Sequence, residues 1–373
     1  MKCKKVTVMT LIKDIIRYLE EIAPASLQES YDNAGLIVGD HETQVTGVVV
    51  CLDSVEDTVD EAISLGANLI VAHHPIVFKG LKRFNGKNYV ERTIIKAIKN
   101  DIAIYAIHTN IDSVLGGVSG KIAEKLGVKN CEILSPKTNR LLKLETYVPV
   151  NQVELVKNAM FEAGAGNVDN YANCSFMTEG KGTFKAKKSA TPYVGEIGKD
   201  HTEAEIKIEV IFNRDKKNRV LDALLSSHPY EEVAYNILSL ENVNRNEGLG
   251  VVGELVDEMN VLEFLEIIKS KMKAGVVRYT QPPKSTIKRV AICGGSGSFL
   301  LSEAKKMDAD LFLTSDFKYH EFFDAENQIV IADIGHYESE QYTSELIYDF
   351  LTQKFSTFAV RISVINTNPV NYL

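Results

Sequence analysis

The chain has 373 residues, which is enough for two or three domains at roughly 100 to 200 residues per domain and excludes a single small module. Hydrophobic residues make up 45% and charged residues 25%, and there are only 24 glycines and 9 prolines, so a long disordered or collagen-like tract is excluded. The formal net charge of −8 gives no diffuse attraction to nucleic acid or anionic lipid, and a nucleic-acid partner would need a local basic patch.

Cysteine spacing and hydropathy favour a reducing compartment. The cysteines lie far apart and none forms a CxxC pair of the kind that seeds a zinc ribbon or a redox motif. They are Cys3, Cys51, Cys131, Cys174 and Cys293. The first apolar run is interrupted by Lys13 and Asp14, too early for a signal peptide, and no run approaches ~20 apolar residues. We therefore expect a cytoplasmic protein without disulfides and without a membrane span.

Both flanks of the chain show strands alternating with helices. Apolar residues at helical spacing from Leu11 to Ile22 predict a first amphipathic helix, which Thr10 can cap. The next predicted elements are strand 48–53, helix 56–66, strand 68–74, helix 89–100 and strand 102–108, and later strand 289–295, a helix to about 308, strand 310–316, helix 318–326, strand 328–336, a long helix and a last strand near 357–365. This alternation predicts βαβ units, that is, an α/β fold with mostly parallel sheets flanked by helices.

The middle of the chain has a different pattern. Residues 141–242 read as strand, helix, charged loop, strand, helix and strand, which is the βαββαβ order of a small ferredoxin-like α+β domain. The long loop at 180–200 is of a length that tends to be functional. Because α/β patterning lies on both sides, we expect residues 139–245 to be a domain inserted into one discontinuous domain formed by residues 1–138 and 246–373.

Three predicted strands end in side chains that bind metals. His73 and His74 follow the first, His108 and Asp112 the second, and His336 and Glu340 the third. In open α/β sheets, ligands bind at the carboxyl ends of strands, so these residues can meet there. Adjacent strand residues point to opposite sides, which suits His73 and His74 to two neighbouring ions.

The number of metal–ligand bonds that these residues can form supports a pair of ions with one position left for water. His73, His74 and His336 supply three bonds, and Asp112 and Glu340 supply four if both bridge, so the total is seven of the about eight that two four-coordinate ions need. Imidazole and carboxylate ligands suit Zn²⁺, with Mn²⁺ or Fe²⁺ as alternatives. The open position favours hydrolysis by a metal-bound hydroxide. His108 is a candidate catalytic proton carrier, or else a hydrogen-bonded strand-end residue.

Three further motifs have structural as well as functional interpretations. CGGSGS at 293–298 follows a strand, and we interpret it as a tight turn with close packing in preference to an anion site. Asp316 and His320 lie at another strand end, where His320 is a second candidate catalytic residue that contacts substrate, or else a surface histidine. HPYEE at 228–232 suits a structural turn, and we place no metal there.

The spaced motifs together resemble a known family. They are YDNAGLIVG (31–39), AHHP (72–75), HTNID (108–112), GLGVVGEL (248–255), CGGSGS, TSDFKYH (314–320) and GHYESE (335–340). In this order they resemble the Nif-three-like dinuclear-metal family, often catalogued as GTP cyclohydrolase I type 2 homologues. The resemblance implies a Nif-three-like α/β fold, two divalent metal ions per chain and a ring-shaped homohexamer with its sites facing an internal cavity. Carried over by motif, the metal ligands are His73, His74, Asp112, His336 and Glu340.

The resemblance extends to the insert and leaves the reaction open. The segments GTFKAK, TPYVGEIG and HPYEEVAYNIL are similar to the PII-like or CutA-like domain of the longer bacterial members. Tyr31 and Ser315 depart from the family's usual Trp and Gly, which bears on local packing and pocket shape rather than on ligands. We expect a metal-dependent hydrolase acting on a small molecule, such as a nucleotide, a phosphoester or an amide. The alternative is a non-enzymatic hexameric scaffold or a regulator that senses a metabolite.

Overall fold

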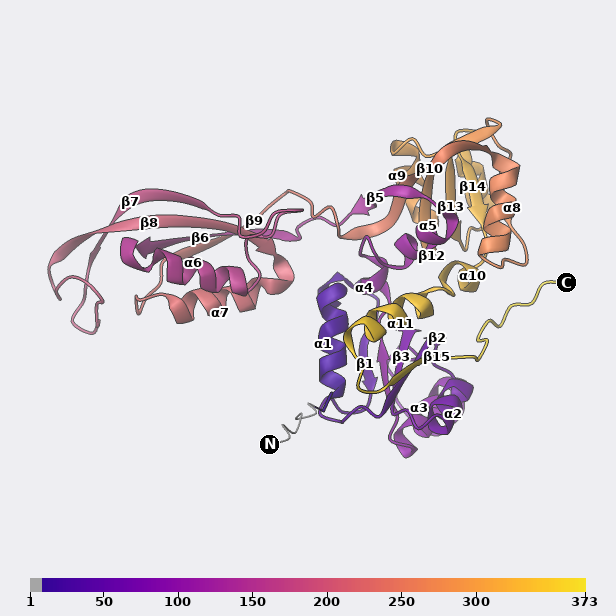
Figure 1. The fold of residues 1–373 in the computed structure, drawn as a ribbon, viewed down its shortest axis with the longest axis horizontal. Coiled ribbons are helices and arrows are strands. Elements are labelled where there is room, and N and C mark those ends of the chain that lie inside the picture. Colours follow the sequence, from indigo (N-terminus) through magenta and orange to yellow (C-terminus); the bar gives the residue numbers. More distant parts are fainter. Residues whose placement is uncertain (1–8) are drawn as a thin grey trace, which may run out of the picture. The chain divides into compact units, whose positions relative to one another are not determined.

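The computed structural model describes residues 9–373, so Cys3 lies outside the described residues. Contacts between residues divide the chain into two compact units. Unit 1 comprises the chain up to Ser135 together with Asn246–Leu373, and unit 2 comprises Pro136–Arg245 (Figure 1). The four described cysteines are free. Within residues 9–373, no helix is both long and apolar enough to cross a membrane.

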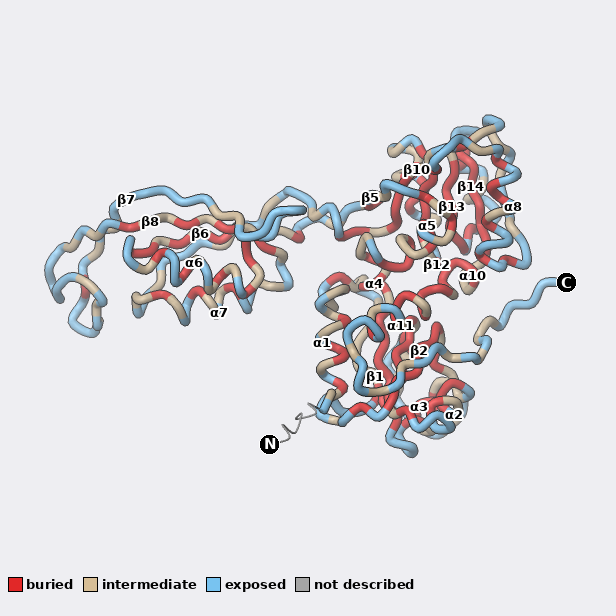
Figure 2. Tube along the Cα trace, in the orientation of Figure 1, coloured by how far each residue is buried: buried red, intermediate tan, exposed pale blue. Residues whose placement is uncertain are grey.

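The first sheet of unit 1 has five strands in the order β1-β4-β3-β2-β15. Its strands are β1 (Gly35–Val38), β2 (Gly47–Asp53), β3 (Leu69–His74), β4 (Ala103–Ala106) and β15 (Ala359–Ile362), and the helices around it are α1 (Ile12–Ile22), α2 (Glu56–Ser64), α3 (Tyr89–Lys99) and α11 (Thr343–Lys354). Side chains alternate along β2, so Val48 packs in the cluster that contains α1 and α11, whereas Val49 packs with α2 and α3. Helices on both faces explain why β2 and β3 are nearly continuous apolar runs (Figure 2).

The second sheet of unit 1 has six strands in the order β11-β14-β13-β12-β10-β5. Its strands are β5 (Lys129–Pro136), β10 (Gly248–Asn260), β11 (Arg278–Tyr279), β12 (Thr286–Ser296), β13 (Leu311–Ser315) and β14 (Val330–Asp333). The neighbouring helices are α4 (Thr109–Asp112), α5 (Val118–Leu126), α8 (Val261–Lys271), α9 (Leu301–Lys306) and α10 (His336–Glu340). One face packs against α5 and α8 and the other against α9. Residues 319–325, expected as an ordinary helix, form a 3₁₀ helix.

Both sheets of unit 1 are mixed, and the expectation of mostly parallel sheets needs correction. The βαβ units do produce parallel pairs, namely β2 with β3, β3 with β4, β12 with β13 and β13 with β14. Strands outside those units join in the opposite direction: β1 is antiparallel to β4, β10 to β12 and β11 to β14. The alternating pattern fixes direction only within a βαβ crossover, and these three strands are not part of one.

Unit 2 contains a four-stranded antiparallel sheet in the order β7-β8-β6-β9. Its elements follow the βαββαβ order: β6 (Leu141–Pro149), α6 (Val153–Glu162), β7 (Phe176–Lys185), β8 (Asp200–Asn213), α7 (Lys217–Ser227) and β9 (Tyr235–Ser239). Both helices lie on one face of the sheet (Figure 1), where they bury the apolar side chains of β6 and β8. The segment expected as a loop at 180–200 is shorter, because β7 continues to Lys185 and leaves residues 186–199 as the connection.

The two ends of unit 1 that flank unit 2 lie beside each other. β5 and β10 are neighbouring strands of the six-stranded sheet. A Cβ placed on Gly253 would lie 2.6 Å from the carbonyl oxygen of Lys129, and one on Gly250 would lie 3.2 Å from Leu134 Cδ2. The end of β5 therefore adjoins the start of β10, which is the geometry that permits a domain to be inserted between them.

We expect that deleting residues 136–245, with Ser135 joined to Asn246 by a short Gly/Ser linker, leaves a folded unit 1. The two joining points are adjacent, so a short linker closes the gap without strain. Circular dichroism and thermal unfolding should show a cooperative transition. A control that also removes β5 uncovers β10 and should unfold at lower temperature. Aggregation of the first deletion would contradict the domain boundaries near 138 and 246, which stay a prediction.

Candidate metal centre

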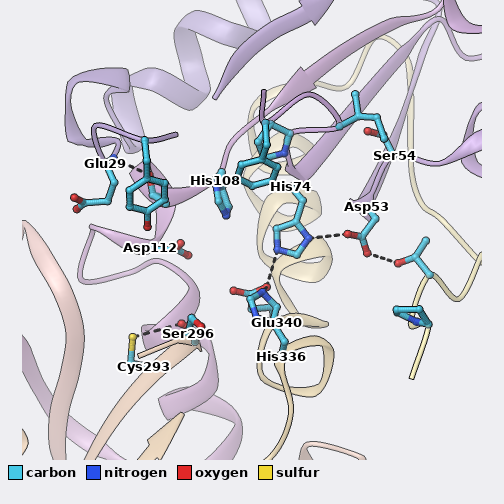
Figure 3. A pocket seen from close by; sticks show the side chains of 18 of the residues that line it. Glu29, Asp53, Ser54, His74, His108, Asp112, Cys293, Ser296, His336 and Glu340 are labelled. Atoms are coloured by element: carbon cyan, nitrogen blue, oxygen red, sulfur yellow. Dashed lines mark hydrogen bonds and ion pairs between the residues drawn. The ribbon is translucent and has the colours of Figure 1, made fainter. Parts of the chain in front are cut away.

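Four histidines and two carboxylates from distant parts of the chain meet in unit 1. His73 and His74 end β3, His108 precedes α4, and Asp112 ends it. His336 and Glu340 are the first and last residues of α10. All except the fully buried His73 line one cavity of about 1070 Å³ (Figure 3). The convergence expected at strand ends is therefore observed for these residues.

Each histidine ring is fixed through its Nδ1 atom. His73 Nδ1 lies 3.0 Å from the carbonyl oxygen of Ile107, to which it donates. The Nδ1 atoms of the other three rings lie 2.7–2.8 Å from carboxylates: His74 pairs with Asp53, His108 with Asp32 and His336 with Asp316. Metal-binding histidines commonly use their second nitrogen in this way, which fixes the tautomer and the ring orientation. The Nε2 atoms are thereby left to face the interior of the cluster.

The inward-facing atoms have too few hydrogen-bond partners. His73 Nε2 lies 3.8 Å from Asp112 Oδ1 and 3.7 Å from Glu340 Oε1, beyond hydrogen-bond distance. His73 Nε2 and Asp112 Oδ1 are both buried without any hydrogen-bond partner. Leaving such atoms unsatisfied is costly, and binding of an ion is a recognised reason for finding them. Their separation is that of two ligands of one shared cation.

The ligand atoms form two overlapping groups. The ring nitrogens of His73, His74 and His108 lie within 4.8 Å of one another, as do the ligand atoms of His74, His336 and Glu340. Glu340 Oε2 lies 2.9 Å from His74 Nε2 and 3.1 Å from His336 Nε2. Both groups mix imidazole with carboxylate neighbours, which is a donor set that suits zinc, manganese or iron.

Burial and charge shift the pKa values within the cluster. Burial lowers the pKa of His73 to about 4, so its Nε2 lone pair is free at neutral pH. Burial also opposes charging of His74, but hydrogen bonds to Asp53 and Glu340 outweigh it and raise the pKa to about 10. The pKa of His336 is raised in the same way, to about 11, because hydrogen bonds to Asp316 and Glu340 outweigh burial. A cation at these nitrogens must displace their protons, so its binding should tighten as pH rises.

The two carboxylates respond in opposite directions. Burial and then the nearby charge of Glu340 raise the pKa of Asp112 well above its usual value. Burial works against the charge of Glu340 too, but its contacts with the rings of His336 and His74 hold its pKa well below the usual value. Without a cation, one carboxylate is thus stabilised by histidine protons and the other is not. A divalent cation between them would remove this conflict.

The supporting carboxylates are themselves held by further hydrogen bonds. Asp32 accepts hydrogen bonds from the backbone N–H of Asn33 and from both the N–H and the hydroxyl of Thr109. Although burial disfavours its charge, these bonds and the one with His108 lower its pKa to about 2. Asp53 accepts from the hydroxyl of Thr367 near the C-terminus. The rings are therefore positioned by a second set of groups that come from several separate segments.

The CGGSGS segment packs directly against the cluster. Gly295 has a φ of +65°, and a Cβ placed on it would overlap Oε1 of Glu340. Its carbonyl oxygen accepts hydrogen bonds from Ser315 Oγ at 2.6 Å and Thr314 Oγ1 at 3.0 Å. The expected close packing is observed, but the expected tight turn is not, because residues 293–296 are the end of β12, with a register shift before Ser296. The departure at Ser315 adds a hydrogen bond to Gly295. Tyr31, the other departure, is exposed at the rim of the cavity.

His320 is not brought to the cluster. It is exposed, packs beside the rings of Tyr319 and Phe323, and is not among the residues that line the cavity. A catalytic role for it stays a prediction without support from this geometry. Within unit 2, His228 of HPYEE instead binds the carbonyl oxygen of Tyr147 at 3.0 Å, in keeping with a structural turn.

Sequence reasoning missed part of the centre. It gives His108 as a proton carrier or a hydrogen-bonded strand-end residue and not as a ligand, whereas the structure pairs its Nδ1 with Asp32 and also places its ring nitrogens within 4.8 Å of those of His73 and His74. It also did not assign Asp32, Asp53 or Asp316 to the histidines they orient. The available signal was position, because Asp53 ends β2 and Asp316 follows β13, at the strand ends where the ligands gather.

Comparison with known proteins gives consistent matches along nearly the whole chain. Residues 10–370 match the family model described as Duf34/NIF3 (NGG1p interacting factor 3). A Bacillus subtilis protein named "GTP cyclohydrolase 1 type 2 homolog" is 37% identical over 367 residues, which cover 97% of this chain and 98% of that protein. A Staphylococcus epidermidis protein of the same name is 35% identical over 97% of this chain and 99% of its own.

Solved structures give the same result. The crystal structure of a Bacillus cereus protein related to NIF3 superposes with a TM-score of 0.86 at 34% identity, covering 98% of this chain and 100% of that one. A Staphylococcus aureus protein superposes with a TM-score of 0.78 at 32% identity, covering 98% and 99%. The arrangement of elements described above is therefore shared with experimentally determined relatives.

We expect Gly295→Ala to lower the free energy of unfolding by about 1–3 kcal/mol, because the methyl group would overlap Glu340 and the backbone has a positive φ. Denaturant unfolding of the metal-free protein measures the change. Gly116→Ala is the matched control, since a Cβ there meets nothing within 4 Å, and its effect should stay within ~0.5 kcal/mol. Equal free energies of unfolding for the two variants would show that Glu340 is not packed against Gly295.

Proposed function

Because the chain belongs to the Duf34/NIF3 family, we propose that it binds two divalent metal ions in unit 1 and uses them as a metal-dependent hydrolase. The observation that carries the proposal is the pair of buried, unpartnered ligand atoms, His73 Nε2 and Asp112 Oδ1, at the centre of the histidine cluster. Purely structural hydrogen bonding would not leave both atoms unsatisfied.

Six side chains would hold the ions. They are His73, His74, His108, Asp112, His336 and Glu340. The two overlapping ligand groups support two ions rather than one. With His108 included, four imidazole nitrogens and two carboxylates would be available to hold the ions. Zinc is our first expectation, with manganese or iron as alternatives.

When bound, a pair of such ions supplies hydroxide at neutral pH and polarises the bond that is broken. The chain's own residues would position that pair. Asp53, Asp32 and Asp316 hold three of the rings in the orientation and tautomer that direct Nε2 inward. The apolar and aromatic lining of the cavity would restrict water around the substrate.

The cavity lining supports a planar, weakly charged substrate. Four aromatic rings more than half exposed line it, which are those of Tyr31, Phe78, Tyr89 and Phe299. None of the described residues that line it is a lysine or an arginine. Aromatic faces stack on heteroaromatic rings, whereas a phosphate chain is usually bound by basic side chains or helix N-termini. A nucleobase-like group is therefore a better fit for this chain than a triphosphate.

Assembly and location are further parts of the proposal. A ring-shaped homohexamer with the cavities facing inward, in the cytoplasm, follows from the family resemblance. The exposed rings around the cavity would then face a shared interior. The alternative function is that of a regulator or scaffold, and the separate cavity in unit 2 favours it, because a sensing domain needs a binding site of its own.

Elemental analysis of the purified protein should give about two metal ions per chain. His74→Ala and Glu340→Ala should each remove at least one equivalent, because His74 belongs to both ligand groups, and Glu340 belongs to one and lies 3.7 Å from His73 of the other. His320→Ala, which alters a histidine outside the cluster, is the control and should keep both. His108→Ala distinguishes its two roles, since loss of a ligand lowers occupancy and loss of a proton carrier does not. Two full equivalents in the His74 and Glu340 variants would reject the site.

Hydrolysis is tested by screening the metal-loaded protein against guanosine, GTP, phosphodiesters and small amides. We expect turnover that is lost in Glu340→Ala, and turnover of guanosine at least as fast as that of GTP, because no lysine or arginine among the described residues lines the cavity to bind the phosphates. Activity that survives in Glu340→Ala would come from a contaminant. If no compound is turned over while two metals are bound, the regulator or scaffold is the better account.

A further inference from the structure

Unit 2 contains a second cavity, of about 1090 Å³, on the face of its sheet opposite α6 and α7. Along β8, Ile206, Ile208 and Val210 point to the helices, so Glu205 and Lys207 point to the other face. Residues 186–193 of the β7–β8 connection form a wall of this cavity. The backbone N–H of Thr191 donates to Glu231 at 2.8 Å, which ties that wall to the segment after α7.

Glu205 is a buried carboxylate in this cavity with no cationic partner. Its exposed fraction is 8%, and it is the only buried residue among the charged side chains that line the cavity. It accepts a hydrogen bond from the hydroxyl of Tyr230, at 2.8 Å, and within the described chain no lysine or arginine forms an ion pair with it. His228 interacts with it electrostatically, but burial lowers the pKa of that imidazole and favours its neutral form. A Cβ on Gly182 would overlap its Oε2, so a glycine in β7 is what makes room for the carboxylate. A buried charge without a counter-charge is costly.

The lysines around the cavity do not supply the missing charge. Lys207 pairs with Glu145 at 3.2 Å and with Glu209. Lys185 pairs with Asp200 at 3.5 Å, and Lys181 and Lys187 are exposed. Glu205 therefore stays uncompensated while its basic neighbours face solvent or other acids.

Aromatic rings line the same cavity. The ring centroid of Tyr230 lies 6.4 Å from that of Phe184 and 6.1 Å from that of Tyr193. Tyr147 lines the cavity too. Aromatic faces attract cations, and a carboxylate beside several rings is the combination that recognises an ammonium group with an apolar body. The volume is suitable for a small molecule.

We propose that this cavity binds a small organic cation, an amine or quaternary ammonium compound, whose charged nitrogen lies against Glu205 and whose apolar part lies against Phe184, Tyr193 and Tyr230. The site is separate from the metal centre in residues and in chemistry. It does not depend on the proposed hydrolase activity, and it gives unit 2 a binding function of its own.

Isothermal titration calorimetry on the full chain tests the proposal with three probes: choline, spermidine and 3,3-dimethylbutan-1-ol, the uncharged isostere of choline. We expect at least one cation to bind saturably at one site per chain, and the uncharged isostere to bind at least tenfold more weakly than choline. Glu205→Gln keeps the shape and the Tyr230 contact but removes the charge, and should weaken cation binding at least tenfold. Glu179→Gln, which alters an exposed carboxylate at the same cavity, should change affinity less than twofold.

Two further measurements distinguish the loss of the cation site from misfolding of unit 2. Tyr193→Ala removes a partly exposed ring and should weaken binding several-fold while unit 2 stays folded by circular dichroism. A saturating cation should raise the melting temperature of the wild-type chain but not that of Glu205→Gln. The proposal is rejected if neither cation binds saturably, if the uncharged isostere binds as well as choline, or if Glu205→Gln and Glu179→Gln bind equally, which would place the cation elsewhere.

Discussion

The structure of unit 1 depends on a cluster of buried polar side chains, two of whose atoms have no hydrogen-bond partner among the described residues. His73 is fully buried, its Nδ1 is committed to a backbone carbonyl, and its Nε2 faces Asp112 and Glu340 without a hydrogen bond. Burial makes the neutral form of His73 favourable and the negative charge of Asp112 unfavourable. The described chain therefore leaves two buried polar atoms here without a hydrogen-bond partner, which is the feature that the proposed metal binding would explain.

The strands and helices around this cluster hold its side chains in place because their backbones approach the cluster closely. β3 ends in two successive histidines, and the parallel strands β2 and β4 flank it in the sheet while helices cover both faces. α10 brings His336 and Glu340 four residues apart, on one side of a single short helix. Gly295 lets β12 approach Glu340 more closely than any side chain would permit. Each ligand is thus fixed by backbone geometry as well as by its hydrogen bonds.

The two units carry two different kinds of cavity. In unit 1 the polar atoms gather at the base and exposed aromatic rings line the entrance, an arrangement that suits chemistry on a planar molecule. In unit 2 one buried carboxylate lies among aromatic side chains on an open sheet face, an arrangement that suits recognition without chemistry. A protein with both can bind one compound while acting on another, which makes the enzyme and regulator interpretations compatible rather than exclusive.

Several features followed from the sequence because they depend on local pattern. The alternation of apolar runs predicted the βαβ units, and the change of pattern near Pro136 and Gly248 indicated the insert. Histidines and acids at strand ends indicated where side chains would converge, since parallel strands end at a common edge. The spacing of His336 and Glu340 placed both on one helix. Even the glycines of CGGSGS indicated close packing.

Other features were decided by tertiary structure alone. The direction of β1, β10 and β11 depends on which edge each strand joins, and no local pattern encodes that choice. The pairing of His108 with Asp32, 76 residues away in sequence, and the presence of His108 beside His73 depend on distances that only the folded chain sets. The sequence also does not reveal that Glu205 is buried without a counter-charge, because several lysines lie near it along the chain. Residue type and periodicity determine which groups can act, but hydrogen-bond partners and burial arise from long-range packing, and these decide which groups are left to bind a ligand.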